Sequence, residues 1–267
     1  MALALNLEPG RTPWDLKFSL FRVPIRVHPL YWLASLLLCY RASDNFGLVL
    51  LAIACMFLSI LVHEFGHIYA QKHYGDEGNH IVFWMFGGLA VPSSSAPHYA
   101  ARVWISLWGP FAGFILGAIV YATGGIVFGW DFPFYYSAST FWFALYHLFW
   151  FNVAWGAMNL LPVFPLDGGQ ILQATGERKR KQQAWAFRIS GYVACAVVLL
   201  CIAAYVFLPS LTFFRDPFMG ILFFVLALQN FYFAWQIKRM GDFGGGSGEA
   251  SFERREVWEQ DPDWWKK

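Results

Sequence analysis

Six apolar segments constrain the fold of this chain more than any other feature of its sequence. They lie roughly at 28–40, 46–70, 101–128, 138–161, 187–208 and 217–237. A helix of about 20 apolar residues can cross the hydrocarbon core of a bilayer, although the first segment is short for this. Only 13% of the residues are charged, against about 25% in a typical soluble domain. The sequence therefore predicts an all-α polytopic membrane protein with about six transmembrane helices.

The positions of the basic residues predict how these helices are oriented. Six spans place both termini on the same side of the membrane. Of the 19 Lys and Arg residues, all but Arg41 and Arg215 lie on that side. Because basic residues gather on the cytoplasmic side, we expect both termini in the cytoplasm. We also expect an integral, multi-pass protein of a bacterial plasma membrane. The start of the chain lacks the apolar core of a signal peptide, so we expect the N-terminus to be retained.

Two stretches outside the long apolar segments have the composition of strands. Residues 16–27 alternate in part, with Pro24 as an interruption, and residues 80–91 are rich in aromatic and β-branched side chains. Gly87 and Gly88 offer a tight turn within the second stretch. The sequence thus predicts a small membrane-associated β-hairpin or sheet that is sheltered by protein. A plain interfacial loop is the alternative.

These features divide the chain into four parts. They are a cytoplasmic N-terminal segment with a possible strand (1–27), a core that holds the candidate site (28–175), two additional transmembrane helices (176–240) and a cytoplasmic tail (241–267). The tail begins with GDFGGGSGEAS, a composition typical of a flexible linker.

The second apolar segment contains the sequence HEFGH, in which His63 and His67 are four residues apart. On a helix they share one face, one turn from each other. This is the geometry for two imidazoles that bind one Zn²⁺, and Glu64 beside them can act as a general base without being a ligand. Ionisable side chains are costly inside a membrane and usually serve a function there. The sequence therefore predicts one zinc ion per chain, with Glu64 as the catalytic residue.

A catalytic zinc ion needs a third protein ligand and an open position. The best candidate is Asp167 in NLLPVFPLDGGQIL, at the end of the fourth apolar segment and at the same predicted depth. It can sit at the N-cap of a following helix, where the helix dipole favours an ionised carboxylate. A simple helix cap is the alternative. The histidines outside the motif are poorer candidates: His28, His73, His80, His98 and His147.

Two asparagines lie upstream of Asp167 on one face of the fourth segment. Asn159 is close to Asp167 in sequence and can donate to a developing oxyanion or to a substrate backbone. We interpret Asn152 as a helix–helix hydrogen-bonding group. The four cysteines all fall in apolar runs without CxxC spacing, so they are expected to pack as small apolar residues.

HEFGH in one apolar segment and NLLPVFPLDGG near the end of another resemble the site-2 protease family of intramembrane zinc metalloproteases. GPFAGF, between them, is similar to the glycine- and proline-rich helix start of that family. The resemblance covers roughly residues 20–175. It implies a protease that cuts membrane-anchored protein substrates within the lipid bilayer, in regulated intramembrane proteolysis, and that needs no nucleic acid. The 129–137 loop and the tail are too short for the PDZ and CBS domains of some members, so a compact form is expected.

The resemblance also implies roles for individual residues. His63, His67 and Asp167 would be the zinc ligands and Glu64 the catalytic base. Asn159 would help to hold the substrate. Gly87 and Gly88 lie where the family has a β-hairpin that can pair with an unwound substrate. The sequence predicts neither the substrate nor the oligomeric state.

Two other classes of protein remain open from the sequence. One is a different membrane zinc metalloenzyme, such as a protease of prenylated chains, which takes a glutamate as its third ligand. Glu77 and Glu177 lack a fitting helical context for that role. The other is a channel, transporter or metal sensor without enzymatic activity, in which a residue that is not a ligand, such as Glu64, is dispensable.

Overall fold

The computed structural model describes residues 9–85, 87–94, 96, 98–134, 137–178, 183–207 and 217–243. Its elements, in chain order, are β1 (Leu16–Leu20), β2 (Val23–Val27), α1 (Pro29–Cys39), α2 (Phe46–His73), β3 (His80–Trp84), β4 (Gly87–Val91), α3 (Tyr99–Phe128), η1 (Phe132–Phe134), α4 (Thr140–Asn159), α5 (Asp167–Arg178), α6 (Gln183–Phe207) and α7 (Pro217–Phe243). The flexible tail expected from residue 241 lies almost entirely outside the described residues.

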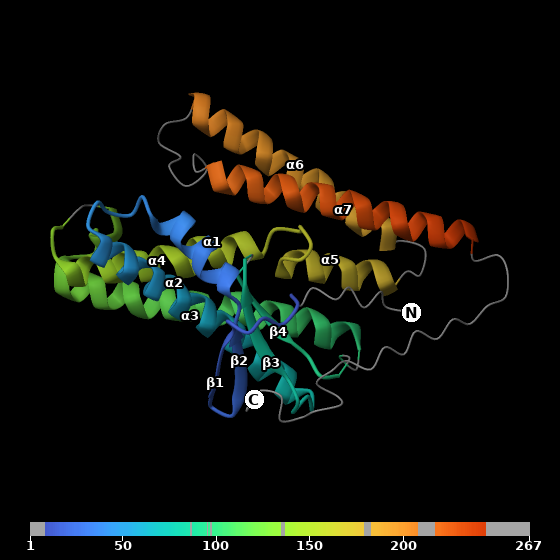
Figure 1. Cartoon of the computed structure of the whole chain (residues 1–267), viewed down its shortest axis with the longest axis horizontal. Coiled ribbons are helices and arrows are strands. Elements are labelled where there is room, and N and C mark those ends of the chain that lie inside the picture. The colour runs from blue at the N-terminus through green and yellow to red at the C-terminus, as the bar shows by residue number, and fades with distance from the viewer. Residues whose placement is uncertain are drawn as a thin grey trace. The chain divides into compact units, whose positions relative to one another are not determined.

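The chain divides into two compact units that meet in the sequence at Met158 and Asn159. The first unit holds the four strands and α1 to α4, and the second holds α5 to α7 (Figure 1). The fold is thus mostly helical, with one small sheet.

The strands form one four-stranded sheet in the order β1-β2-β3-β4. The outer pairs, β1–β2 and β3–β4, are antiparallel, while β2 and β3 are parallel. Pro24 is tolerated because the β2–β3 ladder begins only at Ile25, so its missing N–H removes no bond from that ladder. The expected hairpin at 80–91 is therefore present within a larger sheet that includes the strands of 16–27.

The turn of the second hairpin differs from the sequence-based expectation. Gly87 and Gly88 do not form the turn; they are the first residues of β4 and pair with Trp84 and Phe83 of β3. Gly87 has φ +116°, a conformation that glycine adopts without strain. The glycines therefore belong to the body of the edge strand, and their lack of side chains matters for what approaches it.

Close packing of α2 against α3 depends on a glycine inside the HEFGH sequence. A Cβ at Gly66 would overlap the carbonyl oxygen of Trp108 and would lie 2.9 Å from Cβ of Ala112. The fourth helix joins this pair through Asn152, whose Nδ2 donates to Oγ of Ser59 at 2.9 Å. This bond confirms the structural interpretation of Asn152 and ties α4 to α2 one turn before His63.

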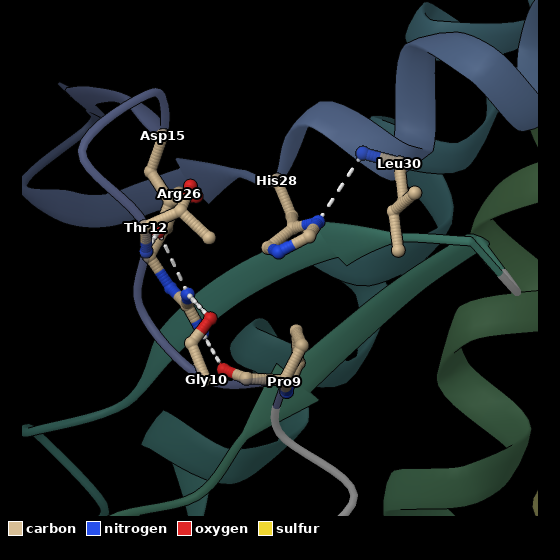
Figure 2. Close-up of polar contacts among 7 residues, drawn as sticks. All are labelled: Pro9, Gly10, Thr12, Asp15, Arg26, His28 and Leu30. Carbon is tan, nitrogen blue, oxygen red and sulfur yellow. Dashed lines mark hydrogen bonds and ion pairs between the residues drawn. The ribbon is translucent and has the colours of Figure 1, made fainter.

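The N-terminal segment is fastened to the sheet by a buried arginine. Arg26 of β2 is fully buried, and its guanidinium donates to the carbonyls of Pro9 and Gly10 and to the carboxylate of Asp15, at 2.9 Å for the ion pair (Figure 2). In the same view His28 caps α1, because its Nδ1 accepts from the N–H of Leu30 at 3.2 Å. His28 therefore has a capping role, in keeping with its rejection as a ligand.

Within the described residues, four helices are long and apolar enough to cross a membrane: Phe46–His73, Tyr99–Phe128, Ala184–Phe207 and Pro217–Arg239. The expected number of six spans is thus not confirmed. Helix α1 has 11 residues, or about 16 Å at 1.5 Å per residue, against a hydrocarbon core of about 30 Å. Helix α4 has 20 residues and is likewise not among these candidates.

Candidate metal centre

The HEFGH sequence lies in the last third of α2, where the helix is buried. The side chains of His63, Glu64 and His67 are 4%, 4% and 7% exposed. The two imidazoles face the same point, since their Nε2 atoms are 3.2 Å apart. One turn of helix has therefore brought the two imidazole nitrogens together inside the first unit, as the spacing predicts.

This separation of nitrogens fits a zinc ion. Zinc–nitrogen bonds are about 2.0–2.1 Å long. For one ion bound to both Nε2 atoms, the N–Zn–N angle would therefore be about 100°. That angle is close to the tetrahedral value that zinc sites prefer. The pair of histidines therefore fits the metal without any rearrangement.

The protonation of His67 is fixed by a carbonyl of the neighbouring helix. Nδ1 of His67 lies 2.7 Å from the carbonyl oxygen of Ile105 in α3. A carbonyl only accepts, so Nδ1 carries the proton and donates it, which leaves the Nε2 lone pair for a metal. The sequence reasoning missed this contact, because no local pattern marks which carbonyl faces a ligand.

Gly109 of α3 keeps the space beside the two imidazoles open. A Cβ at this position would overlap Nε2 of His67 and would lie 2.8 Å from Nε2 of His63. From the sequence, Gly109, Gly113 and Gly117 form one packing stripe. The structure separates them: a Cβ at Gly113 would meet no atom closer than 3.6 Å. The Gly109-Pro110 pair inside an apolar run is the signal that marks the special position.

The carboxylate of Glu64 lies against the edge strand β4. A Cβ at Gly88 would come within 2.6 Å of Oε1 of Glu64. One turn beyond His67, Nε2 of Gln71 donates to the carbonyl of Ala90 at 3.4 Å. Helix α2 thus presents the face with His63 and His67 to α3 and the Glu64 side chain to the sheet, and Gly88 provides the clearance.

Asp167 begins helix α5 in the second unit and is 4% exposed. It is the first residue of the helix, one position later than the expected cap, and the dipole of the helix still favours a negative charge there. The chain before it folds back tightly: a Cβ at Gly168 would overlap the carbonyl oxygen of Leu160, and one at Gly169 would overlap the backbone of Phe164. The two glycines therefore allow this loop to present a carboxylate.

The other expected residues fall in different places. The first unit brings together His63, Glu64, His67 and Gly88. Asn159 ends α4 and is 8% exposed; like Asp167 it belongs to the second unit, and its part in the same centre stays a prediction. His147 bonds the carbonyl of Phe143, one turn earlier in its own helix, at 2.9 Å, as expected of a hydrogen-bonded histidine.

A comparison with protein families matches this chain over more than half its length. The sequence model described as peptidase family M50 matches residues 51–138 and 135–203. The matched region begins in α2, contains HEFGH and Asp167, and reaches into α6.

Curated relatives of this chain are described as zinc metalloproteases or putative zinc metalloproteases. Zinc metalloprotease MJ0392 of Methanocaldococcus jannaschii is 29% identical over 165 residues, which are 61% of this chain and 45% of that protein. Putative zinc metalloprotease Rip3 of Mycobacterium tuberculosis is 28% identical over 152 residues, 55% of this chain and 37% of that protein. The chain thus spans less than half the length of these two relatives. Putative zinc metalloprotease Rip2 of Mycolicibacterium smegmatis is 23% identical over 86% of this chain and all of that protein.

Among solved structures, the site-2 protease from Methanocaldococcus jannaschii has the same fold. The two structures agree with a TM-score of 0.54 at 23% sequence identity, over 84% of this chain and 94% of the other.

Proposed function

Because the chain belongs to peptidase family M50, we propose that it is a zinc-dependent endopeptidase that hydrolyses a peptide bond in or near the transmembrane segment of membrane-anchored proteins. One observation carries this proposal: two histidine Nε2 atoms lie 3.2 Å apart, with a buried glutamate beside them. All three residues lie in a helix that is long and apolar enough to cross a membrane. The names of the curated relatives support the choice of metal and of reaction.

The proposed ligands are His63, His67 and Asp167. His67 has its lone pair fixed by the carbonyl of Ile105, and Asp167 stands in the first turn of α5, where an ionised carboxylate is favoured. When bound there, zinc would lower the pKa of a water molecule and polarise the scissile carbonyl.

Glu64 is the proposed general base. It follows His63 directly on α2, so its carboxylate lies near the ligands but need not bind the metal. Its side chain is buried against β4, away from bulk water. Glu64 would accept a proton from the attacking water and pass it to the amine that leaves.

The edge strand β4 is the proposed docking place for the substrate. In the described part of the sheet, β4 pairs with β3 on one side only. An unwound substrate segment would satisfy its backbone groups by pairing along the other edge. Gly87 and Gly88 would let it approach Glu64 closely, and Asn159 would donate a hydrogen bond to it. The substrates would then be cut in regulated intramembrane proteolysis.

The experiment that tests this function compares the wild type with Glu64→Gln. We expect the purified variant to hold one zinc ion per chain, because Glu64 is not a ligand, and to release no substrate fragments. The measurements are zinc content by mass spectrometry and proteomics of the soluble tails released from membranes. Glu77→Gln, the same change in an exposed connection, is the matched control and should behave as the wild type.

The result also separates the enzyme from a metal carrier. A transporter or sensor should tolerate the loss of a residue that does not bind the metal. Full release of fragments by metal-loaded Glu64→Gln protein would therefore refute the proposed role of Glu64 and favour a different reading of the site.

A further inference from the structure

A fully buried asparagine lies in the apolar helix α7. Asn230 is 0% exposed, within a segment long and apolar enough to cross a membrane. An amide buried among apolar groups costs free energy unless its polar atoms are hydrogen-bonded. The partners of Asn230 therefore indicate why α7 carries a polar side chain at this position.

The amide nitrogen of Asn230 holds a distant loop. Its Nδ2 donates to the carbonyl of Leu226 at 2.8 Å, which is a contact within its own helix. It also donates to the carbonyl of Phe164 at 2.6 Å, across 66 residues of sequence. Phe164 is three residues before Asp167, so this second bond fixes the chain that leads into α5.

The side chain of Phe164 is held as firmly as its carbonyl. Its ring centroid lies 5.4 Å from that of Phe187 in α6 and 6.1 Å from that of Phe233 in α7. Phe187 and Phe233 also contact each other, at 5.4 Å. Helices α6 and α7 thus form a binding place for Phe164, which we call the socket: two aromatic rings contact its ring, and Asn230 donates a hydrogen bond to its carbonyl.

Backbone contacts within the loop connect the position of Phe164 to that of Asp167. The N–H of Leu166 donates to the carbonyl of Val163 at 2.8 Å, and the N–H of Gln170 donates to the carbonyl of Leu166 at 2.9 Å. Gly169 packs without room for a Cβ on the backbone of Phe164. A shift of Phe164 must therefore move the first turn of α5 and the carboxylate of Asp167 with it.

We propose that Asn230 is a positioning residue for the metal centre: by holding the carbonyl of Phe164 it sets the place of the Asp167 carboxylate. The inference rests on the proposed function, in which Asp167 is a zinc ligand. It also gives α6 and α7 a task, since these helices supply the socket on which the ligand loop rests. Groups that orient a ligand typically change metal affinity by about 10–100-fold when they are lost.

The test measures metal binding and not only activity. In Asn230→Leu the donor is replaced by an apolar side chain of similar size, and we expect zinc affinity to fall about 10–100-fold in competition with a chelator. Loaded with Co²⁺, the variant should show a changed visible absorption spectrum, because the spectrum reports the arrangement of the ligands. In Asn230→Ser the hydroxyl can still bond the carbonyl of Leu226 in the same helix but is too short for Phe164, and we expect the same loss.

Phe231→Leu is the matched control on the adjacent residue. Its ring packs on Gly191 and Tyr192 of α6, so the substitution disturbs the same pair of helices without touching the loop. We expect its zinc affinity and its cobalt spectrum to stay as in the wild type. If Asn230 had only a structural role, Asn230→Leu, Asn230→Ser and Phe231→Leu would have the same zinc affinity and the same cobalt spectrum.

Asp167→Ala, measured in parallel, separates the two proposals. If it loses zinc affinity while Asn230→Leu and Asn230→Ser bind zinc as Phe231→Leu does, the role of Asn230 is refuted and the ligand set stands. If Asp167→Ala binds zinc as tightly as the wild type, the ligand set is wrong and the inference falls with it.

Discussion

At the residue scale, the centre depends on an absent side chain as much as on the present ones. Gly109→Ala would place a methyl group where Nε2 of His67 lies. We expect this substitution to lower zinc affinity by at least about tenfold, because the imidazole must turn away from the position in which it binds. Zinc affinity of the purified protein, measured by competition with a chelator, checks the prediction.

Gly113→Ala, one turn further along the same helix, is the control for Gly109→Ala. Both changes raise helix propensity by about 1 kcal/mol, yet the Cβ at Gly113 would meet only ordinary contacts, at 3.6 Å from Oδ1 of Asn152. Zinc affinity should therefore be unchanged in this variant. Equal affinities in the two variants would mean that Gly109 serves helix packing alone.

The sequence predicts contacts between residues that are close together in the chain better than contacts between distant ones. His63, Glu64 and His67 were predictable because the helical repeat alone brings them together. Asn230 and the carbonyl of Ile105 were not, since each acts on a residue 38 or more positions away in the sequence. Local patterns carry no information on such pairs.

At the element scale, the ion pair of Asp15 and Arg26 determines whether the first hairpin stays closed. Burial by itself would raise the pKa of Asp15, but hydrogen bonds from Thr12 and Arg26 outweigh it and hold the pKa below its ordinary value of 3.8. The folded hairpin therefore prefers the charged form. Its contribution to stability is fully present above pH 3.8 and is lost as the pH falls through the lower, folded pKa.

Hydrogen exchange of the amides in β1 and β2 measures this contribution. After correction for intrinsic rates, we expect their protection to stay constant from about pH 8 to about pH 5, since Asp15 is ionised throughout that range. Asp15→Asn removes a hydrogen bond between charged groups, worth about 1.5–3 kcal/mol, so the protection of these amides should be about 10- to 100-fold lower in the variant. Wild-type protection that declines already between pH 7 and pH 5 would contradict the lowered pKa.

For the sheet, the sequence predicted where the strands lie but not how they pair. The strand character of 16–27 and 80–91 was predictable from composition. The parallel pairing of Ile25 with Ile81 was not, because long helices separate the two strands in the chain. The position of the turn was also misjudged: adjacent glycines favour a turn locally, yet here Gly88 serves the close approach of Glu64 to β4, while a Cβ at Gly87 would meet the ring of Trp155.

At the scale of the whole molecule, the membrane character followed from composition, whereas the expected number of six spans is not confirmed. The apolar runs at 28–40 and 138–161 were read as spans. Of the helices within them, α1 is short, at 11 residues, and α4 is not among the four candidate spans of the described residues. An apolar run shows that a segment avoids water, but neighbouring helices shelter a segment as well as lipid does.

The orientation of the protein can be tested without knowing the number of spans. Glu77 follows α2 and Asp131 follows α3, and both side chains are exposed. Helix α3, which lies between them, is long enough to cross the membrane, so the two residues should lie on opposite sides. The excess of basic residues predicts that Glu77 is cytoplasmic.

Cysteine labelling in spheroplasts decides this orientation. With a maleimide that does not cross membranes, we expect Asp131→Cys to be labelled in intact spheroplasts and Glu77→Cys only after the membrane is opened. The four native cysteines are buried or half-buried, so the unmodified protein sets the background. Labelling of Glu77→Cys alone in intact spheroplasts would reverse the orientation and would place the HEFGH end of α2 on the outer side. Labelling of both would show that α3 does not cross the membrane.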